Sequence, residues 1–304
     1  MPDDHDGDDL DRGLAFDLGA MVSRRTVLVT ALGAGAAALL AACGDDDAAP
    51  TSTGSSPTAP STSTTAPVDR GGGGPGRPPT GGSGGGPTTT NGASGPSAVP
   101  EETAGPFPGD GSNGVNALTE TGVVRRDITS SFGSASGTAD GVPMTLRMTI
   151  VDVATNTPLQ GAAVYVWHCD AEGRYSLYSQ GATEENYLRG VQIAAADGSV
   201  TFGSIYPACY SGRWPHIHYE VYPSESSITD ADNKIATSQL ALPDDANQAV
   251  YADSRYGGST ANYARLSLDA DNVFSDGTTN EEPTVTGSVS EGYTLTITSP
   301  VSTS

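Results

Sequence analysis

Alternating apolar and polar positions mark the best-defined element of the chain. From residue 144 to residue 150, every even position is Met, Leu or Ile, and every position between them is Thr or Arg. Side chains alternate between the two faces of a strand, so this pattern predicts a half-buried β-strand. Runs rich in Val, Ile, Thr and aromatic residues predict further strands. These runs lie at residues 162–168, 191–193, 199–202, 216–221, 238–241, 284–289 and 293–297.

The connections between these runs favour an all-β fold. Asp197-Gly198, between residues 191–193 and 199–202, is a hairpin signal, and residues 155–158 form a turn. No long window has helical periodicity. Short strands with turns at this density predict an antiparallel β-sandwich with long loops.

The first 43 residues predict an export signal ahead of the fold. Residues 1–20 form an acidic extension, and residues 21–43 contain a twin arginine followed by an apolar run. That run is too short and too rich in Ala and Gly for a membrane span, which needs about 20 apolar residues. A twin arginine before such a run is typical of a bacterial export signal. A buried Ala-rich helix is the alternative, and the charged residues on both sides of the run disfavour it.

The end of the predicted signal resembles a bacterial lipobox. It reads Leu40-Ala41-Ala42-Cys43, so Cys43 is predicted to be lipidated and to become the mature N-terminus. The chain is therefore expected to leave the cytoplasm by the twin-arginine route, as a cell-surface lipoprotein or a secreted protein. Membrane contact is expected only through the lipid at Cys43.

Composition divides the remainder of the chain in two. Residues 44–97 are mostly Gly, Pro, Ser and Thr, which cannot bury enough apolar surface to fold, so a disordered tether is predicted. Residues 98–304 are long enough for one domain with a single core. The formal net charge of −22 argues against nucleic-acid binding, which requires a basic surface.

The candidate chemistry lies in a short segment near residue 210. Tyr210, Arg213, His216 and His218 fall within nine residues, and Tyr175 lies upstream. On a strand, His216 and His218 share one face and can chelate a single metal ion. Phenolate is a hard anionic donor suited to ferric iron. The alternatives are a solvated His-x-His face and tyrosines that pack at sheet edges.

These residues belong to a longer set of motifs. Gly-Arg-Tyr followed later by Tyr…Arg-x-x-His-x-His resembles the intradiol ring-cleavage dioxygenase superfamily, which includes catechol and protocatechuate dioxygenases. The matching stretches occur in the family's order. They are residues 102–107, 126–128, 166–175, 187–192 and 210–218.

The resemblance implies a function for each matching position. Tyr175 and Tyr210 would supply two phenolates to Fe(III), and His216 and His218 two imidazoles. Tyr210 would be the ligand that leaves the metal when a catechol binds. Arg213 would stabilise negative charge on the substrate, whereas its simplest alternative is a surface cation beside Trp214. The implied fold is a prealbumin-like sandwich.

Two features depart from the family pattern. Only residues 211–212 separate the second tyrosine from the arginine, which shortens one wall of the usual pocket and leaves the substrate preference open. His168 stands where Gln is common. It is a residue that supports the metal ligands without binding the metal, an additional donor to the metal, or a strand residue hydrogen-bonded at the sandwich edge.

The two cysteines after Cys43 lie beside the tyrosine-bearing segments. Cys169 is six residues before Tyr175, and Cys209 is adjacent to Tyr210. A disulfide between Cys169 and Cys209 is predicted for an oxidising compartment, with two buried free thiols as the alternative. A bridge would contribute about 3–4 kcal/mol in the chain-entropy model. Thiolate ligation of the metal is disfavoured because a soft donor does not match ferric iron.

Together these features predict an extracytoplasmic non-haem Fe(III) dioxygenase. It would use O2 to cleave catechol-type rings between the two hydroxyl-bearing carbons, giving muconate-type products. One alternative is a cell-surface β-sandwich binding module without catalysis, and another is an enzyme that uses zinc or copper at the same site. The family's helical dimerisation region has no counterpart here, which leaves a monomeric state open.

Overall fold

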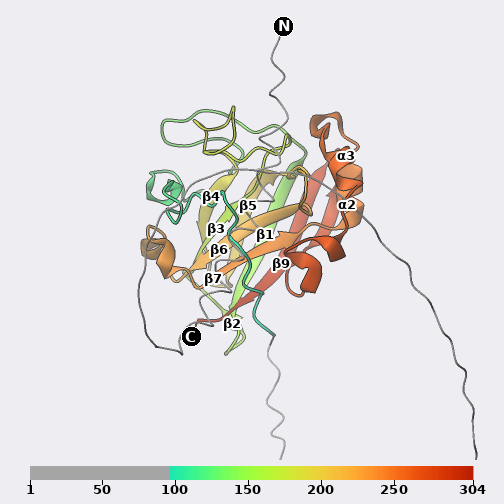
Figure 1. Ribbon diagram of the computed structural model, residues 1–304. Helices are drawn as coiled ribbons and strands as arrows, with labels where there is room; N and C mark the ends of the chain where they lie inside the picture. The colour runs from blue at the N-terminus through green and yellow to red at the C-terminus, as the bar shows by residue number, and fades with distance from the viewer. Residues whose placement is uncertain (1–95, 304) are drawn as a thin grey trace, which may run out of the picture. The chain divides into compact units, whose positions relative to one another are not determined.

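The computed structural model describes residues 96–303, which form two β-sheets connected by long loops (Figure 1). The acidic extension, the export signal with Cys43 and nearly all of the tether lie outside the described residues. Within residues 96–303, no helix has both the length and the apolar character needed to cross a bilayer.

The first sheet is built around the strand with the strict alternation. β1 (Pro143–Asp152) pairs with β9 (Gly292–Val301), and the order of the sheet is β2-β1-β9-β8. β5 (Ser199–Ile205) also pairs with β1. β2 (Thr157–Pro158) and β8 (Thr284–Ser288) complete this sheet. The even-numbered apolar residues of β1 are buried, as the alternation predicts.

The second sheet carries the predicted histidine pair. Its order is β4-β3-β6-β7, and every neighbouring pair in it is antiparallel. Its strands are β3 (Ala163–Trp167), β4 (Arg189–Ile193), β6 (His216–Tyr222) and β7 (Ala236–Ala241). All residues of β6 are buried, so both of its faces are covered. A strand covered on both faces can place polar groups in a dry environment on one side and core residues on the other.

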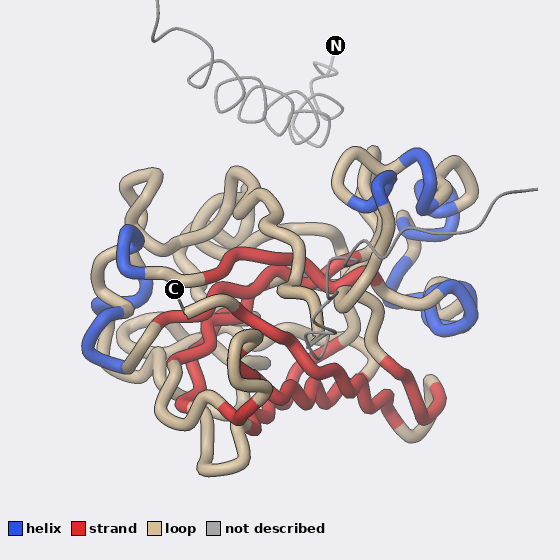
Figure 2. The backbone as a smooth tube through the Cα atoms, turned by 90° about the horizontal axis from the view of Figure 1, so that it is seen from below, coloured by secondary structure: helices blue, strands red, loops and turns tan. Residues whose placement is uncertain are grey.

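One hydrophobic core draws on both sheets. It contains Leu146 and Leu295 from the first sheet and Val164 and Ile217 from the second, all fully buried. The strands in Figure 2 lie together while the loops and helices lie around them. Two sheets that share one core agree with the predicted β-rich fold.

Two predictions about strand pairing are wrong. β1 and β9 are parallel, with Leu146 opposite Leu295, so the first sheet is mixed rather than antiparallel. The predicted hairpin at Asp197-Gly198 is also absent, because β4 pairs with β3 whereas β5 pairs with β1. The turn itself exists, with the Gly198 amide donating to the Ala195 carbonyl, but it carries the chain from one sheet to the other.

Short helices occupy the connections. η1 (Ala117–Thr119) lies before β1, and η2 (Glu225–Ser227) and η3 (Ala231–Asn233) lie between β6 and β7. Between β7 and β8, residues 244–276 form what we call the helical insert (Figure 1, orange to red). The insert contains α2 (Asp244–Val250), η4 (Ser254–Tyr256), α3 (Ser259–Tyr263), η5 (Leu268–Ala270) and η6 (Phe274–Asp276). All these helices are too short for helical periodicity to be detected in the sequence.

A buried carboxyl group lies just beyond the insert. Glu281 is fully buried, and its Oε1 accepts a hydrogen bond from the Ser238 hydroxyl at 3.3 Å. Its Oε2 has no hydrogen-bond partner among the described residues. Burial, followed by repulsion from Glu102, raises the pKa of Glu281 to about 8. Glu281 is therefore protonated in the folded protein at a pH where it is ionised in the unfolded chain.

Replacing Glu281 with Gln tests this consequence. The unfolded carboxyl loses its proton near its ordinary pKa of 4.5, but the folded one keeps it until about pH 8. The free energy of unfolding should therefore fall as pH rises through this window, because the folded state binds more protons. E281Q should flatten this dependence and unfold with a free energy about 1–3 kcal/mol higher than the wild type at pH 8. Urea titrations from pH 5 to pH 8 measure it.

Glu282→Gln is the matched control, because Glu282 is the adjacent exposed carboxylate. Its stability curve should follow that of the wild type. Parallel curves for E281Q and wild type would contradict the raised pKa.

Candidate metal centre

Strand β6 places the two histidines on one face. His216 and His218 are separated by one residue and are each 3% exposed, while Ile217 packs into the core on the opposite face. The Nε2 atoms of the two histidines are 3.1 Å apart, and their rings are almost perpendicular, with an interplanar angle of 81°. The strand therefore brings both imidazoles to one point.

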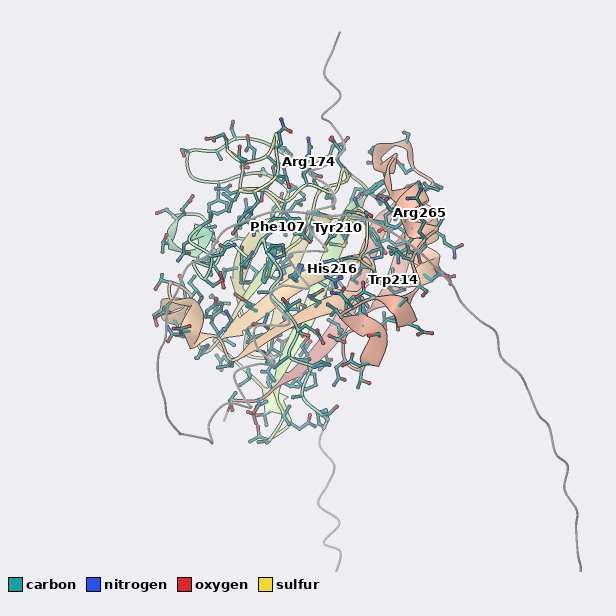
Figure 3. The ribbon with its side chains drawn as sticks, in the orientation of Figure 1. Phe107, Arg174, Tyr210, Trp214, His216 and Arg265 are labelled. Carbon is teal, nitrogen blue, oxygen red and sulfur yellow. The ribbon has the colours of Figure 1, made fainter. Side chains whose placement is uncertain are left out.

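Two loops bring the predicted tyrosines to the same point. Tyr175 lies in the loop between β3 and β4, and Tyr210 lies in the loop that leads into β6. The Tyr210 hydroxyl is 3.1 Å from His216 Nε2, and the Tyr175 hydroxyl is 3.5 Å from the same atom. In Figure 3, Tyr210 and His216 lie near each other in the middle of the molecule. All four predicted donors thus meet within a few ångströms.

The spacing of the donor atoms fits a single metal ion. Nitrogen and oxygen ligands lie about 2.0–2.2 Å from such an ion, so neighbouring ligands are roughly 3.0–3.5 Å from one another. The three separations around His216 Nε2 are 3.1, 3.1 and 3.5 Å. Two phenols and two imidazoles form a hard, oxygen- and nitrogen-only donor set, which suits ferric iron. Residues 96–303 contain no cluster of three or more His, Cys, Asp or Glu that offers another metal site.

Hydrogen bonding prepares His216 as a ligand. Its Nδ1 lies 2.6 Å from the Trp214 carbonyl oxygen, which can only accept, so Nδ1 carries the proton and Nε2 presents its lone pair. Burial and then Arg213 lower the pKa of His216 far below its ordinary value. Burial, His216 and Arg213 do the same for His218, which stacks on Trp167 with ring centroids 4.9 Å apart. Both imidazoles are neutral at physiological pH, as metal ligation requires.

Tyr175, unlike the histidines, must lose a proton to act as a metal ligand. Burial, with a smaller contribution from Tyr210, raises the pKa of Tyr175 well above its ordinary value. Phe107 packs on its ring, with centroids 4.9 Å apart. A phenolate in this environment needs a nearby cation to remain ionised. Metal binding at this site would therefore release a proton from Tyr175.

Arg213 is an interior residue. It is 1% exposed, which excludes the alternative of a surface cation beside Trp214. Its Nε donates to Asp271 Oδ2 at 3.1 Å, and its Nη2 donates to Gln239 Oε1 at 2.8 Å. Its positive charge lowers the pKa of both histidines, so it lies within electrostatic reach of the donor cluster.

His168 does not join the donor cluster. Its Nδ1 donates to the Cys169 carbonyl at 2.8 Å, and its Nε2 is 2.8 Å from the Ser204 hydroxyl. Burial lowers the pKa of His168 to about 4. Both ring nitrogens are engaged, which agrees with the structural alternative for this residue.

The predicted disulfide between Cys169 and Cys209 is not formed. Both residues are buried free thiols. Cys169 Sγ points to the Ala208 carbonyl at 3.6 Å, and Cys209 Sγ lies 3.8 Å from the Tyr210 carbonyl. Burial raises the pKa of Cys209 to about 12, so it remains a thiol at physiological pH. The two tyrosine-bearing loops are held by packing and hydrogen bonds instead.

Two residues of the site were missed by the sequence analysis. Gln239 is opposite His218 in the β6–β7 register, and it links Arg213 to the Thr103 carbonyl. Its position on the strand was predicted, but the register that brings it beside His218 has no local signal. Asp271 lies in the helical insert and has no motif around it.

Comparisons with known proteins find similarity to dioxygenases. A family model described as Dioxygenase matches residues 121–217, a segment that contains Tyr175, Tyr210 and His216 and ends one residue before His218. Chlorocatechol 1,2-dioxygenase of Rhodococcus opacus is 41% identical over 56 residues, which cover 18% of this chain and 22% of that relative.

Solved structures extend the likeness over the described residues. The intradiol ring-cleavage dioxygenase from Tetranychus urticae superposes with a TM-score of 0.53 and 22% identity, covering 68% of this chain and 95% of that one. At this identity the likeness shows the fold. Together with the family match, it supports the resemblance to the intradiol dioxygenase superfamily.

Replacing Tyr175 with Phe tests the donor set. The full-length protein loaded with ferric iron should have a visible charge-transfer band from its tyrosinates. Y175F should weaken iron binding by about 100-fold or more, because it removes a direct ligand. In the wild type, iron binding should tighten as pH rises, since Tyr175 must lose a proton. Metal titrations followed by absorbance measure both effects.

Tyr178→Phe is the matched control. Tyr178 also packs on Phe107, but its hydroxyl bonds to Gly109 and Asn113 rather than to the donor cluster. Y178F should keep the band and the affinity. Equal behaviour of the two variants would remove Tyr175 from the ligand set, and zinc or copper in protein purified from its host would favour another metal.

Proposed function

We propose that this chain is a non-haem Fe(III) dioxygenase that cleaves catechol-type rings between the two hydroxyl-bearing carbons. The observation that carries the proposal is the convergence of two phenol and two imidazole donors around His216 Nε2. A β-rich binding module without catalysis has no use for four such groups in a dry interior, where each unpaired polar atom costs stability.

Each residue of the cluster has a distinct task in this reaction. A bound ferric ion would act as a Lewis acid that draws electron density from a chelating catechol. His216 and His218 are neutral ligands that remain fixed on β6. Tyr210 is only partly buried, and its Oη is suited to leave the metal and take a proton from a substrate hydroxyl.

Arg213 supplies the fixed positive charge of the site. Its guanidinium is buried and held by Asp271 and Gln239, so it does not reorient when charge develops on the substrate. Such preorganised charge contributes more in a dry site than in water. The overall reaction breaks the bond between the two oxygenated ring carbons and places both atoms of O2 in a muconate-type diacid. No external reductant is needed.

We further propose that the enzyme acts outside the cytoplasm. The twin arginine, the apolar run and the lipobox-like sequence before Cys43 support export by the twin-arginine route and a lipid anchor. This route carries folded proteins, so iron could be inserted before export. The predicted iron ligands come together only in the folded domain, and the twin-arginine route exports folded proteins. Each proposal, the iron site and the export route, is therefore consistent with the other.

Oxygen uptake by the iron-loaded, full-length protein tests the catalytic proposal. Catechol and its substituted forms should give one O2 consumed per ring opened, with muconate-type products identified by mass spectrometry. Resorcinol, whose hydroxyls are not adjacent, is the matched control substrate and should not be consumed. A protein that binds iron at this site and opens none of the catechols would leave the binding module as the better description.

Replacing Cys43 with Ser tests the anchor. In the native host, the wild-type protein should be found in the membrane fraction, and C43S should be released, because a single thioether-linked lipid group would be its only attachment. C169S is the matched control, since Cys169 is buried in the domain, and it should fractionate as the wild type does. Membrane retention of C43S would contradict lipidation at this position.

A further inference from the structure

We propose that Asp271 is a positioning residue that holds Arg213, and the loop between β5 and β6 in which it lies, in their working geometry. Asp271 lies outside every motif that identifies the site, and it comes from the helical insert rather than from the sheets. The inference rests on the proposed function for its effect on turnover, but its effect on the loop can be measured without turnover.

The carboxylate of Asp271 binds two consecutive residues of the loop. Its Oδ2 accepts from Arg213 Nε at 3.1 Å and from the Trp214 backbone amide at 2.7 Å. Its Oδ1 accepts from Arg213 Nη2 at 3.3 Å. The same oxygen accepts from the backbone amides of Val273 and Phe274, at 2.9 and 3.2 Å. Both carboxylate oxygens are thus saturated, and the side chain has one allowed orientation.

One residue, Trp214, connects Asp271 to a predicted metal ligand. The Trp214 amide donates to Asp271, and the Trp214 carbonyl accepts from His216 Nδ1 at 2.6 Å. The position of that carbonyl sets both the tautomer and the ring orientation of His216. Asp271 therefore acts on Arg213 directly and on His216 through the backbone.

The insert holds the other end of the same loop. The Cys209 amide donates to the Ser259 hydroxyl at 3.0 Å, and Asn262 Nδ2 donates to the Cys209 carbonyl at 2.9 Å. Between these anchors lie Tyr210, Ser211 and Gly212, and Gly212 has a φ of +87°, which favours glycine. The backbone is thus fixed on both sides of the tyrosine that is proposed to leave the metal.

Burial makes the charge of Asp271 essential to Arg213. The two side chains are each 1% exposed. Removing one partner of a buried ion pair leaves an uncompensated charge, whereas removing both can be nearly neutral. A buried arginine without its carboxylate would move toward other acceptors and away from the position that the substrate requires.

A double-mutant cycle with Asp271→Asn and Arg213→Met tests the proposal in the iron-loaded, full-length protein. D271N should lower kcat/KM for the best catechol by about 100-fold, with most of the loss in kcat, because a displacement of about 1 Å can have this effect. In the R213M background, D271N should lower kcat/KM by about tenfold or less, because only its effect on the Trp214 amide remains. Asp269→Asn, which removes an exposed carboxylate from η5, is the matched control and should behave as wild type.

Hydrogen exchange of the iron-free protein gives a readout that does not depend on activity. D271N should accelerate exchange of the amides of residues 210–216 by about tenfold or more, while D269N should not, because only Asp271 accepts from the Trp214 amide. Should D271N be too unstable to purify, D271E keeps the charge but displaces it by one methylene. D271E should retain iron and lose about tenfold in kcat/KM.

The outcomes separate this inference from the proposed function. Three outcomes would overturn the role of Asp271. The first is an equal loss of kcat/KM from D271N in the wild-type and R213M backgrounds. The others are wild-type turnover of D271N or D271E, and unchanged hydrogen exchange of residues 210–216 in D271N. A wild-type protein that opens no catechol, but whose loop exchanges faster in D271N, would overturn the proposed reaction and leave the positioning role intact.

Discussion

The main constraint on this structure is that its interior holds a cluster of polar side chains with little access to water, which costs free energy of folding. Two imidazoles and two phenols lie within a few ångströms, three of them almost completely buried, and they have few partners except one another. Burial raises the pKa of Tyr175 and lowers the pKa of both histidines, so without a cation the cluster is neutral and poorly satisfied. A trivalent ion would reverse this balance, because the phenols would be held as phenolates and the imidazole lone pairs would be used.

The scaffold meets this requirement by combining a rigid strand with anchored loops. Strand β6 is covered on both faces, so its alternation places His216 and His218 beside the two tyrosines and Ile217 in the core. The tyrosines come from loops, which have no alternation to fix them. Tyr175 is held by packing against Phe107, and the Tyr210 loop is held by Ser259, Asn262 and Asp271 of the insert.

Features that depend on a local sequence pattern, such as single strands and their faces, could be predicted from the sequence. Features that depend on contacts between distant segments, such as strand partners, could not. The alternation from residue 144 to 150 was enough to predict β1, and the His-x-His spacing was enough to predict two imidazoles on one face. The parallel pairing of β1 with β9 joins residues far apart in the chain, and no local signal records it. The turn at Asp197-Gly198 was recognised, but turn chemistry alone cannot tell whether the flanking strands belong to the same sheet. Asp271 was missed because a lone aspartate in a loop resembles a solvated residue until its neighbours are known.

The missed residues complete the electrostatic balance of the site. A ferric centre with two phenolates and the buried guanidinium of Arg213 would place excess positive charge in a region of low polarity. Asp271 offsets the guanidinium where the two are in contact, so the arginine can be kept in the interior and oriented. Gln239 accepts a hydrogen bond from the same guanidinium through its neutral amide oxygen, which helps to orient Arg213 without adding charge. The insert therefore contributes to the electrostatics of the site, because its carboxylate allows a cation to be placed beside the cluster of donor groups.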